Sequence, residues 1–297
     1  MLDILPQLFF NSLITGSIYA LTSAGLALTF ALTRVLNFAH GHIMMSGAYI
    51  FFLFHVQLEH SALVAACEAA LSMSLLGAVS LLTFIIPFLS ASALLPFVTT
   101  IALGSILEAA TSMVFGVNVR SFPTDSASTS IECAGVFITP VQLLIIASAA
   151  VIFLILGLVM HRAPVGRAIR AVSDNTAAAA SLGIPDRRVL FGVFIVSVLL
   201  AGYAGILVGY ETNIQPTMGG SYSIKSFAAM LLGGLGSIWG TVLGALILGF
   251  IENLSVGLDF GGYSLPAGYK DAFAFAIILL VLLVRPQGLL GTKARSA

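Results

Sequence analysis

The sequence predicts an all-α membrane protein with about eight or nine transmembrane helices, broken or re-entrant segments among them. Hydrophobic residues make up 59% of its 297 residues and charged residues only 8%, about a third of the charged fraction usual in soluble domains. Mean hydropathy is +1.09. Uncharged stretches recur, and several reach the roughly 20 residues that a helix needs to cross about 30 Å of hydrocarbon. We therefore expect lipid to be the solvent for much of the surface, because so few polar residues cannot cover a water-soluble core.

Composition also excludes several classes of protein. The net charge is zero, so no general attraction to nucleic acid is expected. Cys67 lies in an apolar run and Cys133 in a polar loop, which favours neither a disulfide nor a metal site. The N-terminus lacks the basic and small-residue pattern of a cleaved signal peptide, so we expect Leu2 onward to be mature protein. The chain is interpreted as one transmembrane domain, 1–297.

The expected crossings follow one another along the chain. The first lies in the uncharged run 4–33, and the second ends near Leu58. The run 61–116 is too long for one helix and predicts two, which reverse near Pro87 and Pro96 because proline breaks a helix interior. Two later crossings are expected at 141–160 and 189–210. A short or broken segment then begins at 226 and breaks near 236–240. One span follows it to about 255, and the last crossing is expected at 267–284.

Basic residues fix the expected orientation. The loop 161–188 carries five arginines against two aspartates, and three basic residues follow the last crossing. Both segments are therefore expected in the cytoplasm. The N-terminus then lies outside and the C-terminus inside, and an outer loop is expected to reach Lys225.

The segment 166–185 is a polar interruption within this loop, and we name it the coupling segment. Pro164 suits the first turn of one short helix, and Ser173 or Asp174 is expected to cap a second, which consists mostly of alanine and ends at Gly183. A narrow, exposed alanine helix could dock in a groove of another protein. The alternative is a loop that lies on lipid headgroups and whose arginines serve only topology.

Four stretches resemble the permeases of branched-chain amino acid ABC importers, in particular the LivH-like subunits. They are VLNFAHGHIMMSGAY, the coupling segment with the following FIVSVLLAGYAGILVG, GGLGSIWGTVLGALILGFIENL, and RPQGLLG, and they extend from residue 35 to residue 291. The resemblance implies a subunit that imports branched-chain or other hydrophobic amino acids across a bacterial inner membrane. It also implies a second, LivM-like permease, two cytoplasmic ATPases that hold ATP and Mg²⁺, and an extracytoplasmic binding protein. This chain itself would hold no cofactor, metal or catalytic residue.

The resemblance makes the coupling segment the contact with the ATPase. The family's usual Glu-Ala-Ala followed by glycine is matched by Ala178, Ala179 and Gly183, whereas Ala177 stands at the glutamate position. A basic loop that the family often carries is absent near 87–96. The residues expected to couple to the ATPase are Arg167, Arg170, Ala177, Ala178, Ala179, Gly183 and Ile184.

Other residues are candidates for the membrane pathway. Asn37 and His40 could line it, or His40 could bond a nearby carbonyl. Glu108 must avoid lipid, so it would either meet the substrate's ammonium group or make an internal hydrogen bond. Glu252 and Asn253 are expected at the membrane interface. The GxxxG-spaced Gly236, Gly240 and Gly244 are expected to pack helices, with substrate contact as the alternative.

Two other functions stay open. One is the same importer with urea or short amides as cargo. The other is a stand-alone secondary carrier, which would need paired ionisable residues inside the membrane.

Overall fold

The computed structural model describes residues 4–89, 94–123, 131–133, 135–257, 259–260, 263–264 and 269–291. Within these ranges the fold is helical apart from two small hairpins, which confirms the predicted class. The helices are α1 (Leu5–Thr33), α2 (His40–Phe52), α3 (Ala62–Ser80), α4 (Leu94–Phe115), α5 (Pro140–Arg162), α6 (Pro164–Asp174), α7 (Thr176–Ser181), α8 (Asp186–Glu211), α9 (Met218–Gly233), α10 (Ile238–Gly257) and α11 (Lys270–Val284). A π-helical turn η2 (Leu53–Gln57) extends α2, and η3 (Leu81–Ile85) and η4 (Ile86–Phe88) extend α3.

Six helical stretches in the described ranges are long and apolar enough to cross a membrane. They are Leu5–Thr33, Ala62–Phe88, Leu94–Phe115, Pro140–Arg162, Asp186–Glu211 and Ile238–Ser255. The other three expected crossings correspond to the shorter α2, α9 and α11. The chain is therefore a multi-pass membrane protein, and within the described ranges the shorter α2, α9 and α11 stand among six full-length spans.

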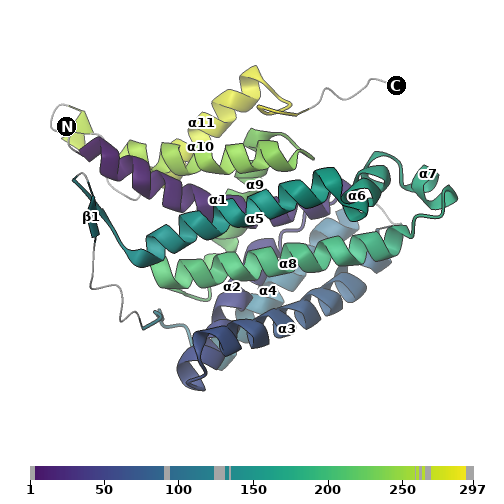
Figure 1. Cartoon of the computed structure of the whole chain (residues 1–297), viewed down its shortest axis with the longest axis horizontal. Helices are drawn as coiled ribbons and strands as arrows, with labels where there is room; N and C mark the ends of the chain where they lie inside the picture. Colours follow the sequence, from purple (N-terminus) through teal and green to yellow (C-terminus); the bar gives the residue numbers. More distant parts are fainter. Residues whose placement is uncertain are drawn as a thin grey trace.

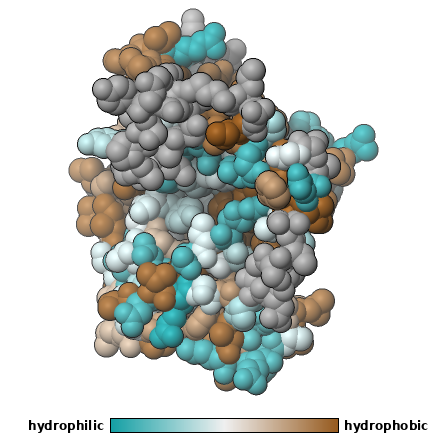
Figure 2. All heavy atoms as spheres, turned by 90° about the vertical axis from the view of Figure 1, so that its left-hand side faces the viewer, coloured by the Kyte–Doolittle hydropathy of each residue, from teal (hydrophilic) through white to brown (hydrophobic). Residues whose placement is uncertain are grey.

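The long helices run side by side, so the molecule has two distinct ends (Figure 1). The start of α1 and β1 lie at one end, and α6 and α7 lie at the other. Figure 2 views the first end, where hydrophilic residues are interspersed with apolar ones. This separation agrees with the expectation that the N-terminus and the coupling segment face opposite sides of the membrane.

Helix α1 forms the centre of the bundle and α5 lies on its outside. In the most apolar stretch of α1, 83% of the residues are buried, against 11% in α5. The exposed side chains of α5 include leucines and valines, as expected for a helix that faces lipid or a partner subunit. A capping box begins α5: Thr139 Oγ1 accepts from the Gln142 amide at 3.3 Å, and the Thr139 amide donates to Gln142 Oε1 at 3.0 Å.

Two antiparallel hairpins lie between helices. Strand β1 (Ile131–Cys133) pairs with β2 (Val136–Ile138), with Ile131 opposite Ile138. Strand β3 (Asp259–Phe260) pairs with β4 (Tyr263–Ser264). Neither hairpin was expected from the sequence, because strands of two or three residues carry no readable periodicity.

The reversal between α3 and α4 was only partly placed by the sequence. Pro87 lies in η4, but Pro96 lies inside the first turn of α4, where a proline leaves no helical hydrogen bond broken. The intervening residues 90–93 fall outside the described part of the chain.

The expected outer loop to Lys225 is wrong, because α9 begins at Met218 and contains that lysine. Its first turn includes Gly219, which sequence reasoning treats as a helix breaker. A Cβ on Gly219 would lie 2.8 Å from the His42 Cα, and one on Gly41 would lie in contact with the Gly219 carbonyl. The close approach of α2 and α9 thus requires glycine and overrides its low helix propensity.

The expected break between the last two glycine-rich helices lies at 234–237, next to the predicted 236–240. Gly234 and Gly236 have φ angles of +115° and +85°, which only glycine adopts readily. The RPQGLLG stretch covers this break: the amides of Leu289 and Leu290 donate to the carbonyls of Leu232 and Gly233, each at 2.9 Å.

Candidate coupling segment and membrane pathway

The coupling segment folds into two short helices outside the spans, α6 and α7. Asn175, rather than Ser173 or Asp174, caps α7: its side chain accepts from the Ala178 amide at 2.9 Å. The expected cap was one or two residues early because α6 continues through Asp174 and the chain becomes extended only at Asn175. An amide oxygen at this position satisfies a backbone donor that the helix leaves unpaired.

Gly183 ends α7 in a Schellman motif. The Ile184 amide donates to the Ala179 carbonyl at 3.1 Å and the Gly183 amide to the Ala180 carbonyl at 3.0 Å, with φ of +83° at Gly183. A residue with a Cβ would be strained in this conformation. The alanine helix therefore has a defined length and a defined exit.

The faces of α7 differ in exposure. Ala177 and Ala178 are exposed, whereas Ala179 is 2% exposed and packs inward. Arg167 is exposed on α6, and the Arg170 guanidinium donates to the Met160 carbonyl at the end of α5. The structure thus places Ala177, Ala178 and Arg167 where a partner could reach them, and it uses Arg170 to join α6 to α5.

The end of α1 holds the coupling segment in place. Ser173 Oγ donates to the Ala31 carbonyl at 3.0 Å, and the Arg34 guanidinium donates to the Ser173 carbonyl at 3.2 Å. The same guanidinium lies beside Gly236, in the turn between α9 and α10. Arg34 therefore bonds the coupling segment and lies near the break in the glycine-rich helices.

Asn37 and His40 lie at the entry of α2, and both are buried. His40 Nε2 donates to the Thr22 carbonyl at 2.9 Å. His40 therefore bonds a nearby carbonyl, which was the expected alternative to lining the membrane pathway. Asn37 Oδ1 accepts from the Ala39 amide at 3.1 Å. Its Nδ2 has no hydrogen-bond partner within the described ranges.

Glu108 meets a histidine that the sequence analysis did not select. His42 Nε2 lies 3.3 Å from Glu108 Oε2, and the two side chains are 13% and 37% exposed. A carboxylate with this exposure cannot face hydrocarbon without a large cost. Ser105 is exposed and Ser112 is half-buried on the same face of α4, at helical spacings of three and four residues from Glu108. This face of α4 is therefore suited to water or to a polar partner.

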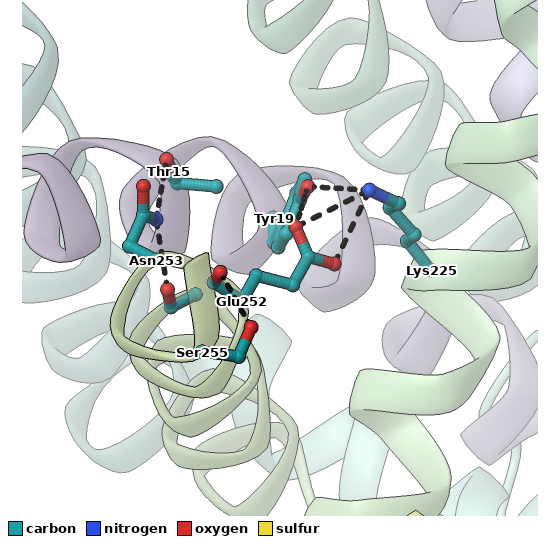
Figure 3. A network of polar contacts seen from close by, with 7 residues as sticks. Thr15, Tyr19, Lys225, Glu252, Asn253 and Ser255 are labelled. Carbon is teal, nitrogen blue, oxygen red and sulfur yellow. Dashed lines mark hydrogen bonds and ion pairs between the residues drawn. The ribbon is translucent and has the colours of Figure 1, made fainter. Parts of the chain in front are cut away.

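A buried polar network joins α1, α9 and α10 (Figure 3). Lys225 Nζ lies 3.2 Å from each carboxylate oxygen of Glu252, whose side chain is 1% exposed. The Tyr19 hydroxyl donates to Glu252 Oε2 at 2.7 Å and accepts from Lys225 at 2.9 Å.

The Glu252 carboxylate thus faces α1 and α9 instead of water, and its expected position at the membrane interface stays a prediction. Asn253 is half-buried, and its Nδ2 donates to Thr15 Oγ1 at 3.2 Å and to the Gly249 carbonyl at 2.9 Å. The one signal available was that Lys225 and Glu252 carry opposite charges and flank the uncharged stretch 226–251.

The three glycines expected to pack helices have two different environments. A Cβ on Gly240 would lie in contact with the Gly233 carbonyl oxygen, and one on Gly244 would lie in contact with the Ala229 carbonyl. Both therefore lie where α10 approaches the α9 backbone closely. Gly236 belongs to the turn, where its positive φ requires glycine.

Comparisons with known proteins identify the family of the chain. The family described as "Branched-chain amino acid transport system / permease component" matches residues 8–282. The high-affinity branched-chain amino acid transport system permease protein BraD of Pseudomonas aeruginosa is 31% identical over 96% of this chain and 95% of its own length. The LivH protein of Escherichia coli K12, with the same description, is 32% identical at the same coverage. Among solved structures, PsaBC from Streptococcus pneumoniae in complex with Fab matches with a TM-score of 0.54 and 11% identity, covering 96% of this chain and 95% of that one. This last likeness concerns the fold alone.

Proposed function

Since the chain belongs to the family of branched-chain amino acid transport permeases, we propose that it is the permease subunit of an ATP-driven importer of branched-chain or other hydrophobic amino acids. The observation that carries the proposal is the match over residues 8–282, together with two permeases that are similar over nearly their whole length. The membrane would be a bacterial inner membrane. A second, LivM-like permease would complete the conduit, and an extracytoplasmic binding protein would deliver the substrate.

The energy would come from two cytoplasmic ATPases, and ATP and Mg²⁺ would bind there and not on this chain. The geometry of α7 supports this assignment, since Ala177 and Ala178 form an exposed, narrow surface outside the spans. Force applied to α7 would reach α1 through the bonds that Ser173 makes with Ala31 and Arg34. Because α1 is the central helix, a shift of its end would be felt throughout the bundle.

The glutamate that the family usually carries in this segment is Ala177 here. No carboxylate at that position can pair with a basic group of the ATPase. Docking would therefore depend on the shape of α7, with Gly183 and Ile184 fixing its end, and on the exposed Arg167.

We place the substrate pathway along the face of α4 that carries Glu108. The second permease would close this face, and Glu108 would meet the substrate's ammonium group while His42 holds the carboxylate in position. Asn37 would contribute its buried Nδ2 near the entry of α2. His40 would serve the packing of α2 on α1 through its bond to Thr22.

The test is uptake of labelled leucine by the complex reconstituted in lipid vesicles, with the binding protein and ATP supplied. Unlabelled isoleucine and valine should compete with leucine, and urea should not. In a parallel assay with labelled urea, uptake of urea but not of leucine would assign the alternative cargo. A complex that takes up neither compound would refute the proposed substrate class.

A further inference from the structure

Two apolar grooves flank the first turns of α8. One groove has a volume of about 550 Å³ and lies among α5, α6 and α8, with Leu156, Val165, Val189 and Val193 among its walls. The other has a volume of about 360 Å³ and lies between α8 and the end of α3. Both volumes fall within the roughly 300–1,000 Å³ typical of sites for small molecules.

The two grooves meet at a pair of arginines. Arg188 lines both grooves, and Arg187 lines the second together with Leu82, Ile86 and Phe191. Both arginines are exposed. Within the described part of the chain, neither guanidinium makes a hydrogen bond or an ion pair. Two basic groups therefore lie unpaired between the two apolar grooves.

This arrangement matches one class of ligand in shape and charge. An anionic glycerophospholipid carries two hydrocarbon chains on one glycerol, which also bears the negatively charged phosphate head. Guanidinium groups bind phosphate oxygens with strong, charge-assisted hydrogen bonds. Basic pockets beside membrane spans recognise anionic headgroups in this way.

We propose that the start of α8 is a binding site for one anionic phospholipid. Its phosphate lies between Arg187 and Arg188, one acyl chain lies in the groove beside α5 and α6, and the other lies in the groove beside α3. A water-soluble protein would have to insert apolar side chains into both grooves at once, which favours lipid as the occupant. The lipid contacts Val165 of α6 and therefore stabilises the position of the coupling segment from the membrane side.

The proposal is tested on the full chain purified in detergent, with bound lipids counted by native mass spectrometry. The probes are phosphatidylglycerol and phosphatidylcholine with identical acyl chains. Phosphatidylglycerol should bind with the higher affinity, at a stoichiometry of one. The double variant Arg187→Gln/Arg188→Gln should lose about 30-fold in affinity, which corresponds to roughly 1 kcal/mol for each basic residue near an anionic surface.

Arg162→Gln is the matched control, because Arg162 is an exposed arginine at the end of α5 that lines neither groove. It should leave the affinity for phosphatidylglycerol unchanged. Equal affinity for the two lipids, or an equal loss in the control and the double variant, would overturn the proposal.

A second variant tests the groove without changing charge. Gly192 lines the larger groove, and a Cβ there meets nothing within 4 Å. Gly192→Leu should therefore fold normally and fill part of the groove, and it should weaken phosphatidylglycerol binding by at least fivefold. Unchanged affinity in a folded Gly192→Leu variant would show that the groove holds no acyl chain.

Discussion

Replacing Lys225 with methionine should lower the free energy of unfolding by about 3–5 kcal/mol, because the substitution removes one partner of a buried ion pair. The Glu252 side chain is 1% exposed, and Lys225 lies 3.2 Å from both of its carboxylate oxygens. The Tyr19 hydroxyl donates to the same carboxylate, but a neutral hydroxyl does not replace the positive charge that Lys225 supplies. The change is measured by reversible denaturation of the purified chain in mixed micelles.

The double variant Lys225→Met/Glu252→Leu separates two contributions to the free energy of unfolding. One is the cost of burying the Glu252 carboxylate, and the other is the loss of its attraction to Lys225. Replacing both partners with apolar residues of similar size is often neutral or stabilising. The double variant should therefore recover most of the stability that Lys225→Met loses.

An exposed pair in the same chain provides the control. His60 Nδ1 lies only 2.7 Å from Glu68 Oε2, but these side chains are 40% and 32% exposed. Exposed pairs contribute at most about 1 kcal/mol, so Glu68→Gln should have a small effect despite the shorter distance. Equal losses in Glu68→Gln and Lys225→Met, or a double variant less stable than Lys225→Met, would refute the reasoning.

Three further predictions concern the coupling segment and the glycine contacts. Ala178→Trp widens the exposed face of α7 without altering a span, so the reconstituted complex should hydrolyse ATP with little uptake. Uptake that stays coupled to ATP hydrolysis would mean that α7 lies on the lipid headgroups and does not dock on the ATPase. Asn175→Ala removes the cap of α7 and should cost about 1 kcal/mol of local stability, seen as faster amide exchange in α7 than in α6; equal exchange would contradict the capping role. Gly240→Ala forces its Cβ against the Gly233 carbonyl oxygen and should lower the free energy of unfolding by about 1–3 kcal/mol. Gly192→Ala meets open space and should stabilise α8 by roughly 0.5–1 kcal/mol, so destabilisation of similar size in both variants would refute the packing argument.

The helical framework could be predicted because hydrophobic length is a local property of the sequence. The uncharged run 4–33 became α1, and the glycine-rich stretch broke within a few residues of the expected place. Even the end of α7 followed from Gly183, since a glycine after an alanine run terminates a helix by its own backbone preference.

The polar partnerships could not be predicted, because they depend on how distant segments approach one another. Glu108 was recognised as a group that must avoid lipid, but its partner His42 lies on another helix. Lys225 was assigned to a loop, whereas it lies in α9 and pairs with Glu252 of α10. The close backbone contact between Gly41 and Gly219 packs α9 against α2, and a single sequence does not reveal such contacts.

The measurement that tests the central claim most directly is the energy source of uptake. Uptake of labelled leucine, delivered by the binding protein, would be measured in vesicles that contain the assembled complex. One condition supplies ATP with no ion gradient, and the other imposes a proton or sodium gradient with no ATP. Leucine should accumulate only with ATP and only when the ATPase subunits are present. Accumulation that follows the ion gradient without the ATPases would contradict the account and would identify a secondary carrier.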